Sequence, residues 1–62
     1  MATDARVRFT KKVIRDAFLS LLREKSVKQI TVTELCRQAE INRATFYKHY
    51  RDAYDLLEQI ET

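Results

Sequence analysis

The chain has 62 residues, enough for one small domain but too few to bury a large core or to enclose an active site. It contains no glycine and no proline, which disfavours β-hairpins, β-sandwiches and flexible linkers. With 45% hydrophobic and 34% charged residues it has enough apolar content to fold, and its formal net charge is +3.

Positive charge is concentrated in two parts of the sequence. Residues 1–15 carry five cations against one acid, and residues 41–52 carry three cations against one acid, whereas residues 53–62 carry three acids and no cation. This polarity predicts a surface that meets a polyanion such as a nucleic acid. On charge alone, a solvated charged face explains the pattern equally well.

The single cysteine, Cys36, offers neither a disulfide nor a thiolate metal site. Its place in an apolar helical pattern favours a small buried side chain over a reactive thiol. No apolar run approaches the roughly 18 residues that a membrane span needs, and the start lacks the apolar core of a signal peptide. We therefore expect a cytoplasmic protein with no metal, no cofactor and no membrane partner.

The first helix is expected from Thr10 to about residue 25. Residues 1–9 show no sustained period and are predicted to form a flexible basic arm, separate from a domain over residues 10–62. Thr10 is predicted to be the N-cap, with Phe9 and Ile14 as a hydrophobic staple. The apolar residues that follow the helical period are Ile14, Ala17, Phe18, Leu21 and Leu22.

The second helix has the clearest start signal in the chain. The segment Thr31-Val32-Thr33-Glu34 matches a capping box, in which a Thr hydroxyl and a Glu carboxylate satisfy each other's backbone donors. We expect a short helix over residues 31–39. Its inward-facing residues are predicted to be Leu35, Cys36 and Ala39.

The period breaks at residues 40–42, and two more helices are predicted. Asn42 should cap a third helix over residues 43–50, and Asp52 a fourth over residues 52–61. Two short helices separated by about three residues are typical of a helix-turn-helix. The predicted fold is all-α, a three-helix homeodomain-like bundle plus the start of a fourth helix. Apolar residues recur in that fourth helix at Tyr54, Leu57 and Ile60.

The third helix divides into two predicted faces. Its inward residues are Ile41, Phe46 and Tyr50, and its outward residues are Arg43, Ala44, Tyr47 and Lys48. Small, basic and aromatic groups together suit the major groove of DNA. Arg can bond guanine bidentately, while Tyr and Ala pack on the thymine methyl group or the sugar-phosphate edge. The predicted phosphate donors beside this face are Thr31, Thr33, Thr45 and His49.

Two other classes of function compete with DNA binding. A helical protein-interaction module would explain exposed aromatic residues at Tyr47 and Tyr54, but it leaves the basic polarity unexplained. Salt discriminates the two, because phosphate-dominated binding weakens steeply with salt and apolar docking does not. An enzyme is disfavoured, because no base lies at a spacing that would orient Cys36 and 62 helical residues leave little volume for a pocket. A single histidine on a basic helix, such as His49, is more typical of a phosphate donor or a surface residue.

Two runs of sequence resemble the DNA-binding domain of the TetR family of transcriptional regulators. They are ITVTELC, from Ile30 to Cys36, and AEINRATFYKHY, from Ala39 to Tyr50. The similarity extends from about Thr10 to Ile60, nearly the whole chain. It implies a homodimeric regulator, usually a repressor, that binds a palindromic operator in double-stranded DNA and is released by a small-molecule effector. It also implies a C-terminal ligand-binding and dimerisation domain that is absent from this sequence.

The resemblance assigns a role to each matching residue. Thr31 and Thr33 match the start of the family's second helix, which meets the DNA backbone. Base-facing positions match Arg43, Ala44 and Tyr47, and mainly phosphate-facing positions match Thr45, Lys48 and His49. Positions that match the family's core are Ile14, Phe18, Leu22, Leu35, Ala39, Ile41, Phe46 and Tyr50.

Three departures from the family pattern carry expectations. Glu40 stands where the turn usually has glycine, so the turn is predicted to be either tighter or strained, since a left-handed backbone costs a non-glycine residue about 1–2 kcal/mol. Ala53 stands where the family often has a phosphate-binding lysine, so that contact should be lost. The missing C-terminal domain should leave Leu57 and Ile60 exposed.

Overall fold

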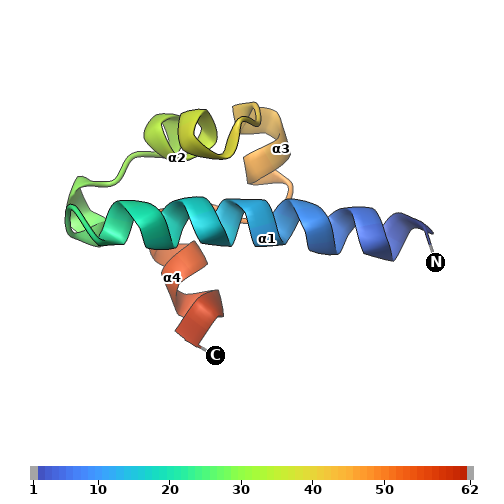
Figure 1. The fold of residues 1–62 in the computed structure, drawn as a ribbon, viewed down its shortest axis with the longest axis horizontal. Coiled ribbons are helices and arrows are strands. Elements are labelled where there is room, and N and C mark those ends of the chain that lie inside the picture. Colours follow the sequence, from blue (N-terminus) through green and yellow to red (C-terminus); the bar gives the residue numbers. More distant parts are fainter. Residues whose placement is uncertain (1, 62) are drawn as a thin grey trace.

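The computed structural model describes residues 2–61, which form four α-helices, one short 3-10 helix and no strand (Figure 1). The elements in chain order are α1 (Ala2–Leu22), η1 (Val27–Gln29), α2 (Val32–Ala39), α3 (Arg43–Tyr47) and α4 (Ala53–Glu61). The all-α class predicted from the sequence is confirmed. No helix of the described part is both long and apolar enough to cross a membrane.

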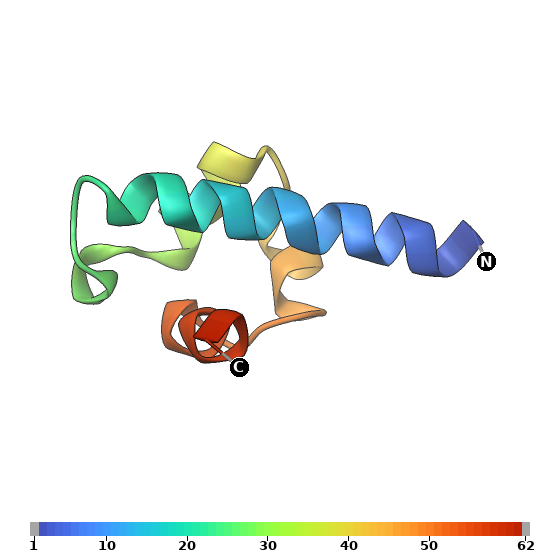
Figure 2. The ribbon, with the colours of Figure 1, turned by 60° about the horizontal axis from the view of Figure 1, so that its bottom comes forward.

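The longest helix, α1, organises the others. In Figure 1 it runs along the length of the molecule, with α2 and α3 along one edge and α4 leaving from the other. α2 contacts α1 and α3, and α4 contacts α1 and η1. Figures 1 and 2 both show the N-terminal end of α1 projecting beyond α3.

The start of α1 corrects a prediction. The helix begins at Ala2, so residues 2–9 are helical and do not form a flexible arm (the arm's first residue, Met1, lies outside the described residues). Thr10 is not an N-cap, since its hydroxyl donates to the Arg6 carbonyl oxygen one turn back, at 3.0 Å. Phe9 is 68% exposed and makes no staple. With no glycine or proline to stop it, a nucleated helix extends backward at little cost.

The end of α1 and the α1–α2 connection also differ from the prediction. The helix ends at Leu22 rather than near residue 25, and η1 follows in the connection to α2. Lys25 lies 2.5 Å from the Glu34 carboxylate, measured from Nζ to Oε2. This ion pair ties the connection to the first turn of α2.

The core is centred on Phe18 and Phe46, whose side chains are completely buried. The predicted core is confirmed except at Leu22 and Ile41, which pack against it but remain half-exposed. Three buried residues of the described chain were not predicted as core: Ile30, which precedes α2, and Ala53 and Leu56 in α4. The cluster is formed by Ile14, Phe18, Leu21, Ile30, Leu35, Cys36, Phe46, Tyr50, Ala53 and Leu56.

Each short helix begins at a side-chain cap, as the sequence predicted. Thr31 Oγ1 accepts from the Glu34 N–H at 3.1 Å, Asn42 Oδ1 from the Thr45 N–H at 2.8 Å, and Asp52 Oδ1 from the Asp55 N–H at 2.8 Å. The Glu34 carboxylate does not complete the reciprocal half of the capping box at α2, because it accepts from Lys25 Nζ instead.

The side of α4 that packs on the core is not the one marked by the period of Tyr54, Leu57 and Ile60. Ala53 and Leu56 are buried, whereas Tyr54 is 54% exposed. Leu57 and Ile60, expected to be exposed, are half-buried against the core. A three-residue period in a nine-residue helix fits two neighbouring faces almost equally well, so only the packing distinguishes them.

Candidate nucleic-acid interface

The turn between α2 and α3 depends on an unusual backbone conformation at Glu40. Its φ of 60° and ψ of 43° are left-handed, and it is the one non-glycine residue with positive φ in the described chain. The Glu40 N–H is directed at the carbonyl oxygens of Arg37 and Cys36, and the Ile41 N–H donates to Cys36 at 3.0 Å. Of the two alternatives expected for this turn, the strained one is therefore observed.

The third helix is shorter than predicted. α3 spans Arg43–Tyr47, and Lys48 follows as its C-cap with helical dihedral angles. The His49 and Tyr50 N–H groups both donate to the Phe46 carbonyl oxygen, at 3.0 Å each. The chain after α3 therefore continues to turn around Phe46, and it keeps Lys48 and His49 next to the helix that presents the predicted base-facing residues.

The two faces of α3 lie as predicted. Phe46 is fully buried, whereas the adjacent Tyr47 is 53% exposed. The two rings meet edge to face with centroids 5.6 Å apart, so the buried ring also supports the exposed one. Arg43, Ala44 and Lys48 are exposed, and Thr45 and His49 are half-buried beside them.

The two threonines at the start of α2 are also accessible. Thr31 and Thr33 are both exposed. Thr31 uses an oxygen lone pair to cap the helix, which leaves its hydroxyl proton free to donate. The arrangement therefore presents hydroxyl donors at the start of α2 and cations on α3, the two helices of the helix-turn-helix.

The cysteine behind this surface is buried and held in its thiol form. Cys36 is 4% exposed, and burial raises the pKa of its thiol more than the nearby Arg43 lowers it. The thiol form is therefore favoured, and the predicted role as a small buried side chain is confirmed. Burial likewise raises the pKa of Tyr50, with Arg15 opposing that shift and Asp55 adding to it.

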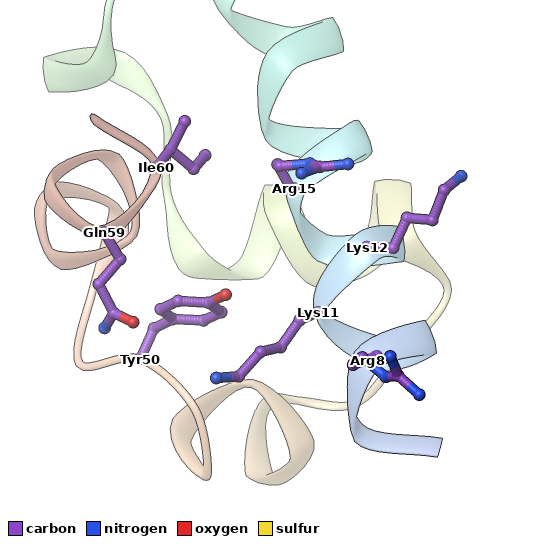
Figure 3. Close-up of a pocket in the computed structure, with 7 residues that line it drawn as sticks. All are labelled: Arg8, Lys11, Lys12, Arg15, Tyr50, Gln59 and Ile60. Atoms are coloured by element: carbon purple, nitrogen blue, oxygen red, sulfur yellow. The ribbon is translucent and has the colours of Figure 1, made fainter. Parts of the chain in front are cut away.

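Sequence reasoning missed a group of cations on α1. Arg8, Lys11, Lys12 and Arg15 line an open groove of about 460 Å³ whose other wall contains Tyr50 (Figure 3). Their spacing of three, one and three residues places them along one side of a helix. The pattern was visible in the sequence, but it was obscured because residues 1–9 were treated as an arm without a face.

Comparison with known proteins identifies the domain. Residues 14–60 match the family model described as bacterial regulatory proteins, tetR family. The chain belongs to the TetR family. It therefore carries the helix-turn-helix DNA-binding domain of a transcriptional regulator, and the family is not one of enzymes.

Two relatives among known TetR-type regulators are similar over most of this chain. It is 41% identical over 56 residues to the HTH-type transcriptional regulator YxbF of Bacillus subtilis (strain 168), covering 89% of the chain and 15% of that protein. It is 35% identical over 51 residues to the HTH-type dhaKLM operon transcriptional activator DhaS of Lactococcus lactis subsp. lactis (strain IL1403), covering 82% and 27%. No solved structure gives a significant match.

Proposed function

We propose that α3 enters the major groove and reads bases with the residues on its outer side. Arg43 bonds guanine, and Ala44 and Tyr47 pack on thymine methyl groups or the sugar edge. The observation that carries this proposal is the opposite exposure of two neighbouring rings, Phe46 at 0% and Tyr47 at 53%. Tyr47 rests one edge on Phe46 but leaves about half of its surface in solvent, and with exposed Arg43 on the same helix it forms a surface suited to base contact.

Phosphate contacts set the register of α3 in the groove. Lys48 and His49 supply them at the end of α3, with Thr45 beside them, and Thr31 and Thr33 supply them at the start of α2. Such contacts position a protein on the duplex and carry no sequence information by themselves. Ala53 is 4% exposed and carries no donor, so the start of α4 contributes no cation at that position.

The intact regulator is proposed to be a homodimer that binds a palindromic operator and is released by a small-molecule effector. This chain spans 15% and 27% of the two relatives' lengths, which leaves room in such proteins for a C-terminal domain that dimerises and binds ligand. Two helix-turn-helix units would then occupy half-sites about one DNA turn, or a multiple of it, apart.

Repression is the proposed sign of regulation. One relative is named a transcriptional activator, so the sign requires its own test. Expression of a reporter gene placed downstream of the operator should rise when the regulator is deleted and when the effector is added. Reporter expression that falls when the regulator is deleted would establish activation instead.

Selection of bound duplexes from a random pool tests sequence-specific binding. This chain should enrich a single half-site, weakly, because it lacks the avidity of a second half-site. The intact regulator should enrich an inverted repeat of the same half-site. Failure to enrich any sequence, at a salt concentration where non-specific binding is suppressed, would contradict the proposed function.

A further inference from the structure

The groove between α1 and α4 gathers positive charge on a surface that the helix-turn-helix does not use. The α1 wall carries four cations within eight residues, and Tyr50 lies across from them, with its ring directed toward α1 (Figure 3). The α4 wall contributes only Gln59 and Ile60, which are uncharged. The positive charge therefore lies on the α1 side.

Little negative charge offsets these cations. The Asp16 carboxylate lies 3.3 Å from Lys12 Nζ and 4.0 Å from Arg15 Nε, with more than half of the Asp16 side chain exposed. This one carboxylate offsets one of the four positive charges and leaves the α1 side positive. Among the described residues, no ion pair involves Arg8 or Lys11.

The groove suits a strand of phosphates along α1 better than an acidic protein segment seated inside it. The Asp55 carboxylate accepts from Gln59 at 3.3 Å, so an acidic segment filling the groove would meet a carboxylate beside its α4 wall. A phosphate strand needs only the outer rim. From Arg8 to Arg15 the helix rises about 10 Å, which is long enough to contact more than one phosphate of a strand.

The groove also continues from the proposed DNA-binding surface. Lys48 and His49 immediately precede Tyr50, which turns back into the groove because its N–H is bonded to Phe46. The phenol hydroxyl is a donor within the groove, and burial favours its protonated form. Cations and donors thus run from the end of α3 to the middle of α1.

We propose that Arg8, Lys11, Lys12 and Arg15, with Tyr50, form a second DNA-binding site that takes the phosphates of duplex flanking the base pairs read by α3. This proposal rests on the proposed function, because it assigns a further part of the same duplex to the protein. The site adds affinity and salt dependence without adding sequence preference.

Lys11→Gln and Arg8→Gln test the proposal by fluorescence anisotropy. The selected half-site is placed in a trimmed duplex and in one extended by about ten base pairs on each side, and binding is measured across a salt series. On the extended duplex, each substitution should reduce the slope of log K against log salt by about one. On the trimmed duplex, wild type and variants should have the same slope.

Arg23→Gln is the matched control, since it removes one exposed cation just beyond the other end of α1. It should change neither slope by a full unit. If Arg23→Gln and Lys11→Gln behave alike, net charge alone is responsible and the site does not exist. If Lys11→Gln weakens both duplexes equally, the contact lies within the half-site and the flanking assignment is wrong.

Failure of this proposal is distinguishable from failure of the proposed function. A wild-type protein that prefers its selected half-site, with Lys11→Gln unchanged on every duplex, overturns the second site alone and favours an acidic protein segment as the occupant. A wild-type protein with no sequence preference overturns the proposed function itself.

Discussion

The inner and outer sides of the helix-turn-helix differ in what holds each in place. The inner side is fixed by packing, with Phe46 and Leu35 completely or almost completely buried. The outer side has no such packing, and Arg43 and Tyr47 extend into solvent. What the outer side presents is therefore set from behind, by the core and by the caps that orient the helix.

The length of α3 makes this dependence strong. Five residues are far below the roughly 12–15 that an isolated helix needs in water. The helix persists because Asn42 caps its start and Phe46 anchors its middle. Damage to the inner side should therefore abolish folding and DNA binding together, whereas damage to the outer side should abolish binding alone.

Phe46→Ala, on the inner side, should have the largest effect on the stability of the domain. Truncating a buried aromatic residue costs about 3–5 kcal/mol, which can equal the whole stability of a small domain. We expect loss of the helical circular-dichroism signal or a melt displaced far downward, and the same for Phe18→Ala. Tyr47→Ala, at the adjacent position, is the control, and it should melt much closer to the wild type, because it loses only one edge-to-face ring contact. Equal melts for Phe46→Ala and wild type would contradict the assigned core.

Arg43→Ala and Lys48→Ala should separate the roles on the outer side. Loss of a base contact at Arg43 should cost about 1–3 kcal/mol and relax specificity at one base position. Loss of a phosphate contact at Lys48 should weaken all sequences evenly and lower the salt slope by about one. Binding to a panel of operator variants measures both effects. Identical profiles for the two variants would show that the base and phosphate assignments are wrong.

Asn42→Ala should destabilise α3 as a whole, and with it both its inner and its outer side, because it removes the N-cap of the helix. Removing the oxygen that accepts from the Thr45 N–H costs about 1 kcal/mol, as is typical of N-cap loss. The free energy of unfolding from a urea titration should fall by that amount. Asn42→Asp retains the acceptor and should restore most of the loss, which a general effect of mutation at this site would not predict.

Glu40→Gly should stabilise the domain slightly. Glycine removes the left-handed strain of about 1–2 kcal/mol at φ 60°, while the more flexible unfolded chain offsets part of that gain. A net gain of up to about 1 kcal/mol in the free energy of unfolding is expected. Gln38→Gly, two residues earlier in α2, should instead destabilise by about 1 kcal/mol. A loss at both positions would show that Glu40 carries no strain.

Asp55 should contribute the smallest effect, and one that depends on pH. The Arg51 N–H donates to its carboxylate at 3.0 Å, and this bond lowers the pKa of Asp55. The contribution of this carboxylate to the free energy of unfolding is therefore complete above the usual Asp pKa of about 4. It is lost as pH falls through the lower pKa of Asp55 in the folded state. Asp55→Asn should melt slightly below wild type at pH 7 and match it near pH 2. A difference in melting temperature that stays constant from about pH 7 to about pH 2 would exclude the carboxylate as the cause.

The sequence alone determined the features that depend on neighbours along the chain. Caps at Thr31, Asn42 and Asp52 were predictable because a cap bonds a backbone group only three residues away. The different faces of α3 on which Phe46 and Tyr47 lie follow from helical geometry once Asn42 fixes the start of the helix. The left-handed turn at Glu40 was one of two local alternatives that the sequence left open.

Only the tertiary structure decided what depends on distant neighbours. The buried register of α4 is set by contact of Leu56 with the core, because a short helix offers two similar apolar faces. The pairing of Glu34 with Lys25 was chosen over the local capping box because the connection brings a cation from nine residues away. The basic groove exists because α1 and α4 meet, and residues far apart in sequence acquire a common surface only through that packing.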